Sequence, residues 1–172
     1  MDKNILLFTG TGKGKSTAAF GMALRAVGHN QRVLIIQFMK QDESVGELSS
    51  LQQLGISVIQ TGLGFVPRPE NPRYPEHQQA AQQGFALACK AMNSGDYDLI
   101  VLDEMCGAVA KGLLEERAVT DALVSAPAPL NIVLTGRDAT VNMIALADTV
   151  SHITPVKHAL EQGVPARKGV EF

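Results

Sequence analysis

The 172-residue sequence has no tryptophan, two cysteines and no strong excess of either charge. Cys89 and Cys106 form no Cys-x-x-Cys pair, so we expect two buried thiols in a reducing compartment and no disulfide framework. The net charge of −2, with both signs interspersed, argues against a nucleic-acid-binding surface. A small anion, held locally, is therefore the expected kind of ligand.

Long apolar runs are also missing. No stretch approaches the roughly 18 apolar residues of a membrane span, so we expect neither a signal peptide nor a membrane anchor. These absences predict a cytoplasmic protein that does not partner with membranes or nucleic acids.

Four short runs of bulky apolar residues are present instead, at residues 5–8, 33–36, 99–102 and 132–134. Continuous apolarity is typical of strands that helices cover on both faces, and helix-patterned stretches separate the runs. The pattern predicts one α/β domain over residues 1–172, with a mostly parallel sheet flanked by helices. The first helix, at residues 16–27, is expected to place Phe20, Leu24 and Val27 on one face.

The most informative stretch directly follows the first apolar run. It reads Thr9-Gly10-Thr11-Gly12-Lys13-Gly14-Lys15-Ser16-Thr17. A glycine-rich loop between a strand and a helix makes a nest of backbone N–H groups that can cradle a triphosphate. Residues 14–16 fit the end of the G-x-x-x-x-G-K-[ST] pattern, while Thr9 replaces its first glycine. A plain glycine-rich turn is the alternative interpretation.

Two carboxylates, Asp103 and Glu104, end the third apolar run. The carboxyl end of a parallel strand lies where ligands bind, so Asp103 is expected to reach a magnesium ion directly or through water. Glu104 would contact the metal, the nucleotide or an attacking water; alternatively, both carboxylates simply cap the next helix. Arg137 emerges at the same edge, either to contact phosphate or to pair locally.

A long segment at residues 62–75 carries four of the eight prolines and two aromatic residues, Phe65 and Tyr74. Loops of this length in compact domains are usually functional or disordered. A surface excursion without function is the alternative. The helix that follows is expected over residues 76–92.

In order along the chain, these motifs resemble those of the ATP:corrinoid adenosyltransferases of the CobA/CobO/BtuR type. The phosphate loop is similar to the family's G-[ND]-G-K-G-K-[ST]-[ST], with Thr11 where Asn or Asp is usual. Further similar segments lie at residues 18–28, 33–40, 64–65, 102–104, 134–137, 147–150, 155–159 and 168–172. His152 and Ile153 depart from an acidic and a long apolar residue in the family's tail motif. The resemblance implies a P-loop NTPase-like (RecA-like) fold.

The resemblance also implies an activity, the transfer of the 5′-deoxyadenosyl group of ATP to the Co(I) of a reduced corrinoid with release of triphosphate. Co(I) would attack the ribose C5′ directly, so the chemistry belongs to the corrinoid. ATP would lie in the reverse sense on the loop. The protein would hold C5′ in line with cobalt, stabilise charge on the leaving triphosphate and exclude water.

Residue roles follow from the same resemblance. The backbone amides of residues 10–14, with Lys13 and Lys15, would cradle the triphosphate. Ser16 and Glu104, with Asp103 in support, would hold Mg²⁺ or Mn²⁺. Lys15 and Glu104 are the candidate catalytic residues. The candidates for ATP binding are Gly10, Thr11, Gly12, Lys13, Gly14, Lys15, Ser16, Thr17, Arg25 and Arg137.

For the corrinoid, the resemblance implies that the loop at residues 62–74 is a flap, with Phe65 in contact. One branch of the family has Phe-x-Trp here, a pair that displaces the lower ligand of the corrin. This chain has Pro67 at the tryptophan position, so Tyr74 or a looser apolar wall would substitute. A homodimer is implied, and a flavoprotein reductant is a further expected partner.

Two other functions stay open at this point. One is a RecA-like ATPase or small kinase, with Glu104 activating water and Arg137 sensing phosphate. The other is a nucleotide-binding regulatory module that has kept the cradle and lost the transfer reaction.

Overall fold

The computed structural model describes residues 2–42 and 45–170, and its strands form one six-stranded sheet in the order β3-β2-β4-β5-β1-β6. All neighbouring strands are parallel, as the apolar runs predicted. The strands are β1 (Asn4–Thr9), β2 (Val33–Gln37), β3 (Ser57–Gln60), β4 (Leu99–Asp103), β5 (Asn131–Thr135) and β6 (Thr149–His152). Because every strand runs the same way, all the strand carboxyl ends meet at one edge.

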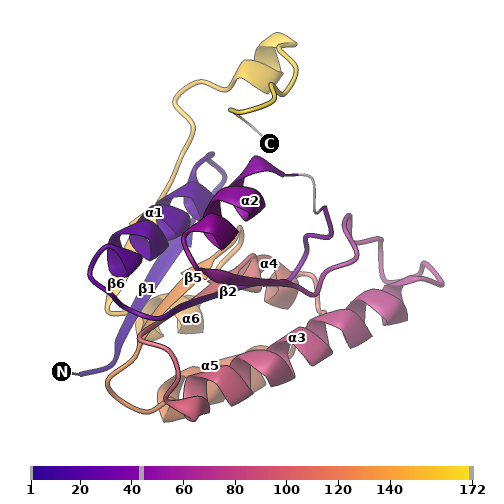
Figure 1. Cartoon of the computed structure of the whole chain (residues 1–172). Helices are drawn as coiled ribbons and strands as arrows, with labels where there is room; N and C mark the ends of the chain where they lie inside the picture. The colour runs from indigo at the N-terminus through magenta and orange to yellow at the C-terminus, as the bar shows by residue number, and fades with distance from the viewer. Residues whose placement is uncertain (1, 43–44, 171–172) are drawn as a thin grey trace.

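Helices cover both faces of the sheet. They are α1 (Lys15–Val27), α2 (Gly46–Gln53), α3 (Tyr74–Ser94), α4 (Met105–Ala110), α5 (Glu116–Ser125) and α6 (Val141–Leu146), followed by the 3-10 turn η1 (Ala159–Gln162). Figure 1 shows α1 and α2 on one side of the sheet and α3 and α5 on the other. Among the described residues, no helix is both long and apolar enough to cross a lipid bilayer.

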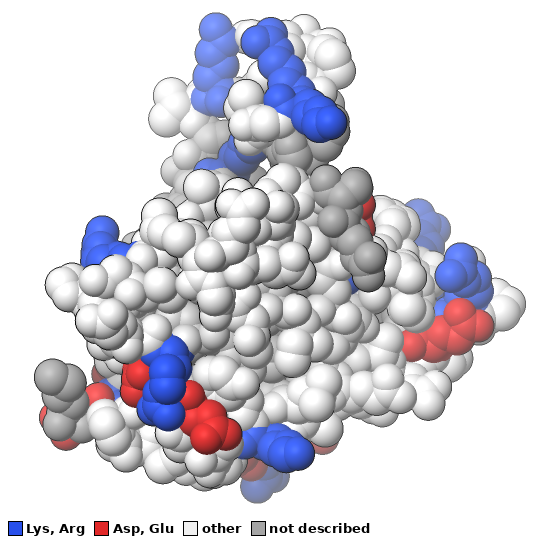
Figure 2. Space-filling view, viewed as in Figure 1, with Lys and Arg blue, Asp and Glu red and all other residues white. Residues whose placement is uncertain are grey.

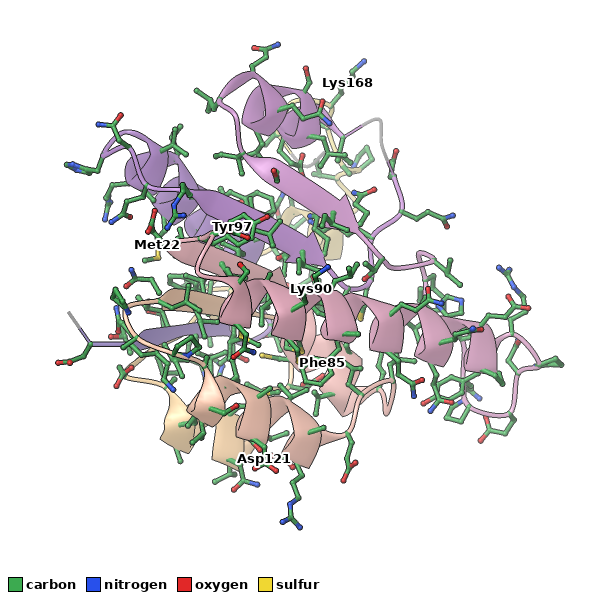
Figure 3. The ribbon with its side chains drawn as sticks, turned by 60° about the horizontal axis from the view of Figure 1, so that its bottom comes forward. Met22, Phe85, Lys90, Tyr97, Asp121 and Lys168 are labelled. Atoms are coloured by element: carbon green, nitrogen blue, oxygen red, sulfur yellow. The ribbon has the colours of Figure 1, made fainter. Side chains whose placement is uncertain are left out.

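The central strands are buried on both faces, and their side chains divide between two cores. Every residue of β2 and of β4 is buried, which explains the lack of polar alternation in the sequence. Ile35 and Val101 pack toward α1, whereas Ile36 and Leu102 belong to the core beneath α3, α4 and α5. Phe85 lies on the side of α3 that faces α5 (Figure 3) and packs against this second core.

The apolar face predicted for α1 is only partly packed, because Phe20 and Val27 lie against the core while Leu24 does not. The helix buries alanines, and Leu24 is 53% exposed. Small side chains let the helix axis approach the sheet closely, so Phe20 and Val27 are only partly buried against the core and Leu24 stays outside it. The buried positions are Ala19, Ala23 and Ala26.

The long segment before α3 is shorter than predicted, because the helix begins at Tyr74. Pro75 fits the first turn, where a missing N–H breaks no intrahelical hydrogen bond. The Tyr74 hydroxyl donates to the Lys111 carbonyl at 2.7 Å, and the ring packs against the core. Tyr74 is therefore a structural residue, whereas Phe65 is 92% exposed in the remaining loop.

The tail after β6 leaves the sheet and stands above α1 and α2 (Figure 1). Lys and Arg side chains lie on this tail, at the top of the space-filling view, while the centre of the same face carries few charges (Figure 2). Residues 171–172, the end of the tail motif that resembles the family's, lie outside the described residues.

Candidate functional site

The phosphate loop joins β1 to α1 through two glycines with left-handed backbone conformations. Gly10 has a φ of 100° and Gly14, the N-cap of α1, a φ of 109°. A Cβ on Gly10 would lie 2.4 Å from the Ile153 carbonyl oxygen and 2.4 Å from the His152 ring. Glycine is thus required here both by the turn and by the close approach of β6.

The end of β6 holds the loop from behind. The Ile153 amide donates to the Thr9 carbonyl at 2.8 Å, and the Gly12 amide donates to the Ile153 carbonyl at 2.8 Å. The Gly12 amide therefore shapes the loop, and the expectation that all amides of residues 10–14 face the phosphates does not hold for Gly12. His152 and Ile153, two departures from the family pattern, form this support.

Lys15 is a buried cation at the loop rim. It is 8% exposed, and its Nζ donates to the Gly12 carbonyl at 2.6 Å. Burial lowers the pKa of Lys15, and the charge of Arg137 lowers it further, while Glu104 and Asp103 raise it. Two cations and two carboxylates from distant parts of the chain thus act on one another here.

Asp103 is fully buried and has partners on both carboxylate oxygens. Oδ1 accepts from the Thr135 hydroxyl at 2.7 Å, and Oδ2 accepts from the Gln37 side-chain amide at 3.0 Å. Lys40 Nζ lies 3.3 Å from Oδ2 and 3.9 Å from Glu47 Oε1. Asp103 is therefore an anchored residue that organises the ends of β2, β4 and β5.

Glu104 is arranged differently. Its φ of 65° is left-handed, which is costly for a residue with a side chain, and its N–H donates to the Thr135 hydroxyl at 2.9 Å. Glu104 is the N-cap residue of α4, but within the described residues its carboxylate makes no capping hydrogen bond and has no other hydrogen-bond partner. Burial raises the pKa of Glu104, as does Asp103, against the opposing charges of Lys40, Lys15 and Arg137. An anion held this way favours a cationic ligand.

One cavity of about 910 Å³ brings most of the predicted residues together. The predicted residues on its wall are Thr11, Gly12, Lys13, Gly14, Lys15, Ser16, Thr17, Glu104 and Arg137. Segments that follow β1, β4 and β5 thus meet in one place, because parallel strands deliver their carboxyl ends to the same edge.

Other predicted residues lie elsewhere. Arg25 is exposed in the last turn of α1, ten residues or about 15 Å along the helix axis from Lys15. Gly10 begins the loop and packs against His152 and Ile153. Asp103 is fully buried, and Phe65 lies on the loop between β3 and α3. The structure does not bring these four to the wall of the cavity.

Sequence reasoning missed Lys40, Gln37 and Thr135 as parts of the site. The signal was available, because Gln37 and Thr135 are polar residues that end apolar strands, as Asp103 does. His158 also lines the cavity, from the tail. His158 reaches the cavity because the tail after β6 lies above α1 and α2 (Figure 1).

The residues present fit a magnesium ion. No group of three His, Cys, Asp or Glu side chains is assembled in the part of the chain that the structure describes. However, Mg²⁺ in nucleotide sites is usually held by one or two carboxylates together with phosphate oxygens and water. The Glu104 carboxylate and Ser16 share the wall of one cavity, and both supply oxygen.

Comparison with solved structures supports the fold. The flagellar accessory protein FlaH from Methanocaldococcus jannaschii superposes with a TM-score of 0.57 at 12% identity, covering 88% of this chain and 70% of that protein. The predicted P-loop NTPase-like fold is thus confirmed, and a likeness at this identity says nothing more.

Sequence comparison identifies the family. A corrinoid adenosyltransferase of Escherichia coli (strain K12) is 36% identical over 168 residues, which cover 98% of this chain and 85% of the relative. Corrinoid adenosyltransferase CobA of Salmonella typhimurium (strain LT2) is 38% identical over 169 residues, with the same coverage. The family model described as ATP:corrinoid adenosyltransferase BtuR/CobO/CobP matches residues 2–172. The chain belongs to this family of ATP:corrinoid adenosyltransferases.

Proposed function

We propose that this transferase attaches the 5′-deoxyadenosyl group of ATP to the Co(I) of a reduced corrinoid and releases triphosphate. Co(I) supplies the electron pair of the new cobalt–carbon bond, and the pair of the broken C5′–O bond leaves with the triphosphate. The enzyme would thus be an alkyl transferase. The proposal depends most on one observation, that the phosphate loop, Lys15, Arg137 and Glu104 share a single cavity.

The loop and its cations would hold the triphosphate. Lys13, Lys15 and Arg137 line the cavity that follows the glycine loop, where they would stabilise negative charge as it gathers on the leaving group. For C5′ to meet cobalt, the nucleotide must lie with its ribose toward the open side of the cavity. We propose this reversed orientation of ATP on the loop.

Ser16 and Glu104 would hold Mg²⁺, or Mn²⁺ in its place. The bound ion would neutralise charge on the triphosphate. Asp103 would act indirectly, because both of its oxygens are engaged by Thr135, Gln37 and Lys40. Its bond to the Thr135 hydroxyl positions the Glu104 backbone, since the same hydroxyl accepts from the Glu104 N–H.

Phe65 is proposed as the aromatic contact to the corrin, because it is exposed on a loop and Tyr74 is engaged in packing. The Phe65 ring would act without the tryptophan that one branch of the family has. We further propose a homodimer, a flavoprotein as electron donor, and a reducing compartment such as the cytoplasm, which suits a Co(I) substrate and the free thiols Cys89 and Cys106.

The test combines the purified protein, ATP, Mg²⁺ and a chemically reduced corrinoid under anaerobic conditions. We expect equal amounts of a corrinoid with a carbon–cobalt bond and of inorganic triphosphate. ADP and phosphate without alkylated corrinoid would contradict the proposal and favour an ATPase. Nucleotide binding without turnover would contradict it in favour of a regulatory module.

A further inference from the structure

The last residues of four neighbouring strands form a row of polar side chains across the carboxyl edge of the sheet. They are Gln60 of β3, Gln37 of β2, Asp103 of β4 and Thr135 of β5. We call these four residues the polar row. Gln37 lies in register with Gln60 on one side and with Asp103 on the other. Because side chains alternate along a strand, the row faces α1, as Ile35 and Val101 do two residues earlier.

Hydrogen bonds join the polar row from end to end. Gln60 Nε2 donates to Gln37 Oε1 at 2.9 Å, and Gln37 Nε2 donates to Asp103 Oδ2 at 3.0 Å. The Thr135 hydroxyl donates to Asp103 Oδ1 at 2.7 Å and accepts from the Glu104 N–H at 2.9 Å. The chain of bonds therefore runs from an edge strand of the sheet to the backbone of Glu104, which lines the cavity.

The direction of each bond in the polar row is fixed. An ionised carboxylate only accepts, so the Gln37 amide presents its N–H to Asp103 and its oxygen to Gln60. The one proton of the Thr135 hydroxyl is used on Asp103, which leaves a lone pair of the same oxygen for the Glu104 N–H. Turning either side chain over would set two acceptors against each other. The row thus has a single arrangement of its hydrogen bonds.

Packing alone does not explain the polar row. Gln37, Asp103 and Thr135 are fully buried, although the residues before them in the same strands are apolar. A buried polar side chain costs free energy unless it is hydrogen-bonded, whereas an apolar one would fill the space without that requirement. Polar residues at these positions therefore point to a role in geometry.

The geometry that needs support is that of Glu104. Its φ of 65° is left-handed, which costs free energy in a residue with a side chain. The Thr135 hydroxyl accepts its N–H, Asp103 holds that hydroxyl, and Gln37 holds the other oxygen of Asp103. Lys40 Nζ is also 3.3 Å from this oxygen, but its side chain is 30% exposed and its stem is flexible, so it holds the carboxylate less firmly.

We propose that Gln37 is a positioning residue, which orients Asp103 and, through Thr135, places the Glu104 carboxylate for Mg²⁺. The inference rests on the proposed function in taking Glu104 as a metal ligand. It adds a buried residue that is not on the wall of the cavity. Outer partners of this kind orient the groups that bind a metal, and their loss typically weakens metal binding about 10- to 100-fold.

The test measures ATP affinity by calorimetry with and without Mg²⁺, which separates the gain due to the metal from binding of the nucleotide itself. Gln37→Met keeps the length of the side chain and removes its hydrogen bonds. We expect it to lower the Mg²⁺-dependent gain at least about 10-fold and to change metal-free ATP affinity less than about twofold. Binding of Mn²⁺ to the ATP complex, followed by electron paramagnetic resonance, should weaken in parallel.

A double-mutant cycle tests whether Gln37 acts through Glu104. Glu104→Gln should lose the Mg²⁺-dependent gain by itself. Adding Gln37→Met to that variant should change the remaining gain less than about twofold, because the residue through which Gln37 acts is already replaced. Losses that multiply would place the effect of Gln37 elsewhere and contradict the proposal.

Two control variants address the general effects of substitution. Gln83→Met makes the same chemical change at an exposed position of α3 and should keep the Mg²⁺-dependent gain. Leu123→Ala opens a cavity in the core that α5 covers, so it should lower stability and still keep the gain. Urea unfolding of all the variants shows that each is folded under the conditions of the titration.

Three further results would overturn the proposal. One is a Gln37→Met protein that keeps the full Mg²⁺-dependent gain, and another is an equal loss of ATP affinity with and without the metal. The third is a gain that Glu104→Gln leaves intact, since Glu104 would then not hold the ion. None of these measurements requires turnover, so failure of this inference is distinguishable from failure of the adenosyl transfer.

Discussion

The two edges of the sheet use the same kinds of charged residue in opposite ways. At the amino edge, between the starts of β2 and β4, Asp98 receives three hydrogen bonds from Arg32 at 2.8, 3.1 and 2.9 Å. These bonds lower the pKa of Asp98 to about 2. The pair is solvent-exposed and complete, and it joins two strand ends.

At the carboxyl edge the shifts have the opposite sign. Burial lowers the pKa of Lys15 and raises that of Glu104, so both charged forms are disfavoured by the folded protein alone. At the amino edge Arg32 and Asp98 stabilise each other's charged forms, whereas at the carboxyl edge the pKa values of Lys15 and Glu104 are shifted toward the neutral forms. Shifts of this second kind, in a cavity, point to function more strongly than ion pairs do.

Removing the buried cation should have the largest effect. Lys15→Ala is expected to lower the rate of transfer about 100-fold or more, the loss found when a group that stabilises the transition state is deleted. Single-turnover formation of the carbon–cobalt bond, followed by absorbance, measures the rate. Arg32→Ala at the amino edge is the control and should leave the rate unchanged. An equal loss of transfer rate in Lys15→Ala and Arg32→Ala would contradict a functional difference between the two edges of the sheet.

Glu104→Gln should separate activity from stability. Transfer is expected to fall at least about 10-fold, because loss of even an outer-shell partner of a metal ligand costs that much and Glu104 is proposed as a ligand itself. Stability of the ligand-free protein should rise at pH 7. The raised folded-state pKa means that ionisation opposes folding above the ordinary value of 4.5, and glutamine removes that penalty. Urea unfolding at pH 7 and pH 4 measures the difference, which should vanish at the lower pH.

Asp98→Asn should show the reverse pH dependence. A folded-state pKa of about 2 against an ordinary value of 3.8 means that the carboxylate stabilises the fold above pH 4. That contribution is lost as pH falls through 2, so the variant should be less stable than the parent at pH 7 and approach it only below pH 2. Denaturant titration across this range is the measurement. A difference in unfolding free energy between variant and parent that is the same at all pH values would contradict the lowered pKa of Asp98.

Phe65→Ala should have the smallest effect, because the side chain makes no core contact. We expect a change in unfolding free energy within about 0.5 kcal/mol. Transfer that starts from Co(II) should slow more than transfer that starts from Co(I), because the ring is proposed to assist reduction. Parallel assays from the two oxidation states test this. Equal slowing from both would argue against the flap.

Much of the site could be predicted from the sequence because its chemistry is local. The glycine loop, the strand before it and the helix after it are adjacent in the chain, so Lys15 and Ser16 could be placed without a structure. Asp103 and Glu104 could be placed because a parallel sheet brings strand ends to one edge. Helical periodicity failed at Leu24, since apolarity alone does not distinguish a side chain that packs against the core from one that stays exposed.

The sequence by itself determined the parallel sheet, the phosphate loop and the family, because each depends on residues that are neighbours along the chain. Only the tertiary structure decided which charges are satisfied. It gave both oxygens of Asp103 hydrogen-bond partners, left the Glu104 carboxylate without one among the described residues, and bonded the Gly12 amide to the Ile153 carbonyl after β6. The physical reason is that burial and hydrogen-bond partnership come from segments far apart in sequence, which only the folded sheet brings together.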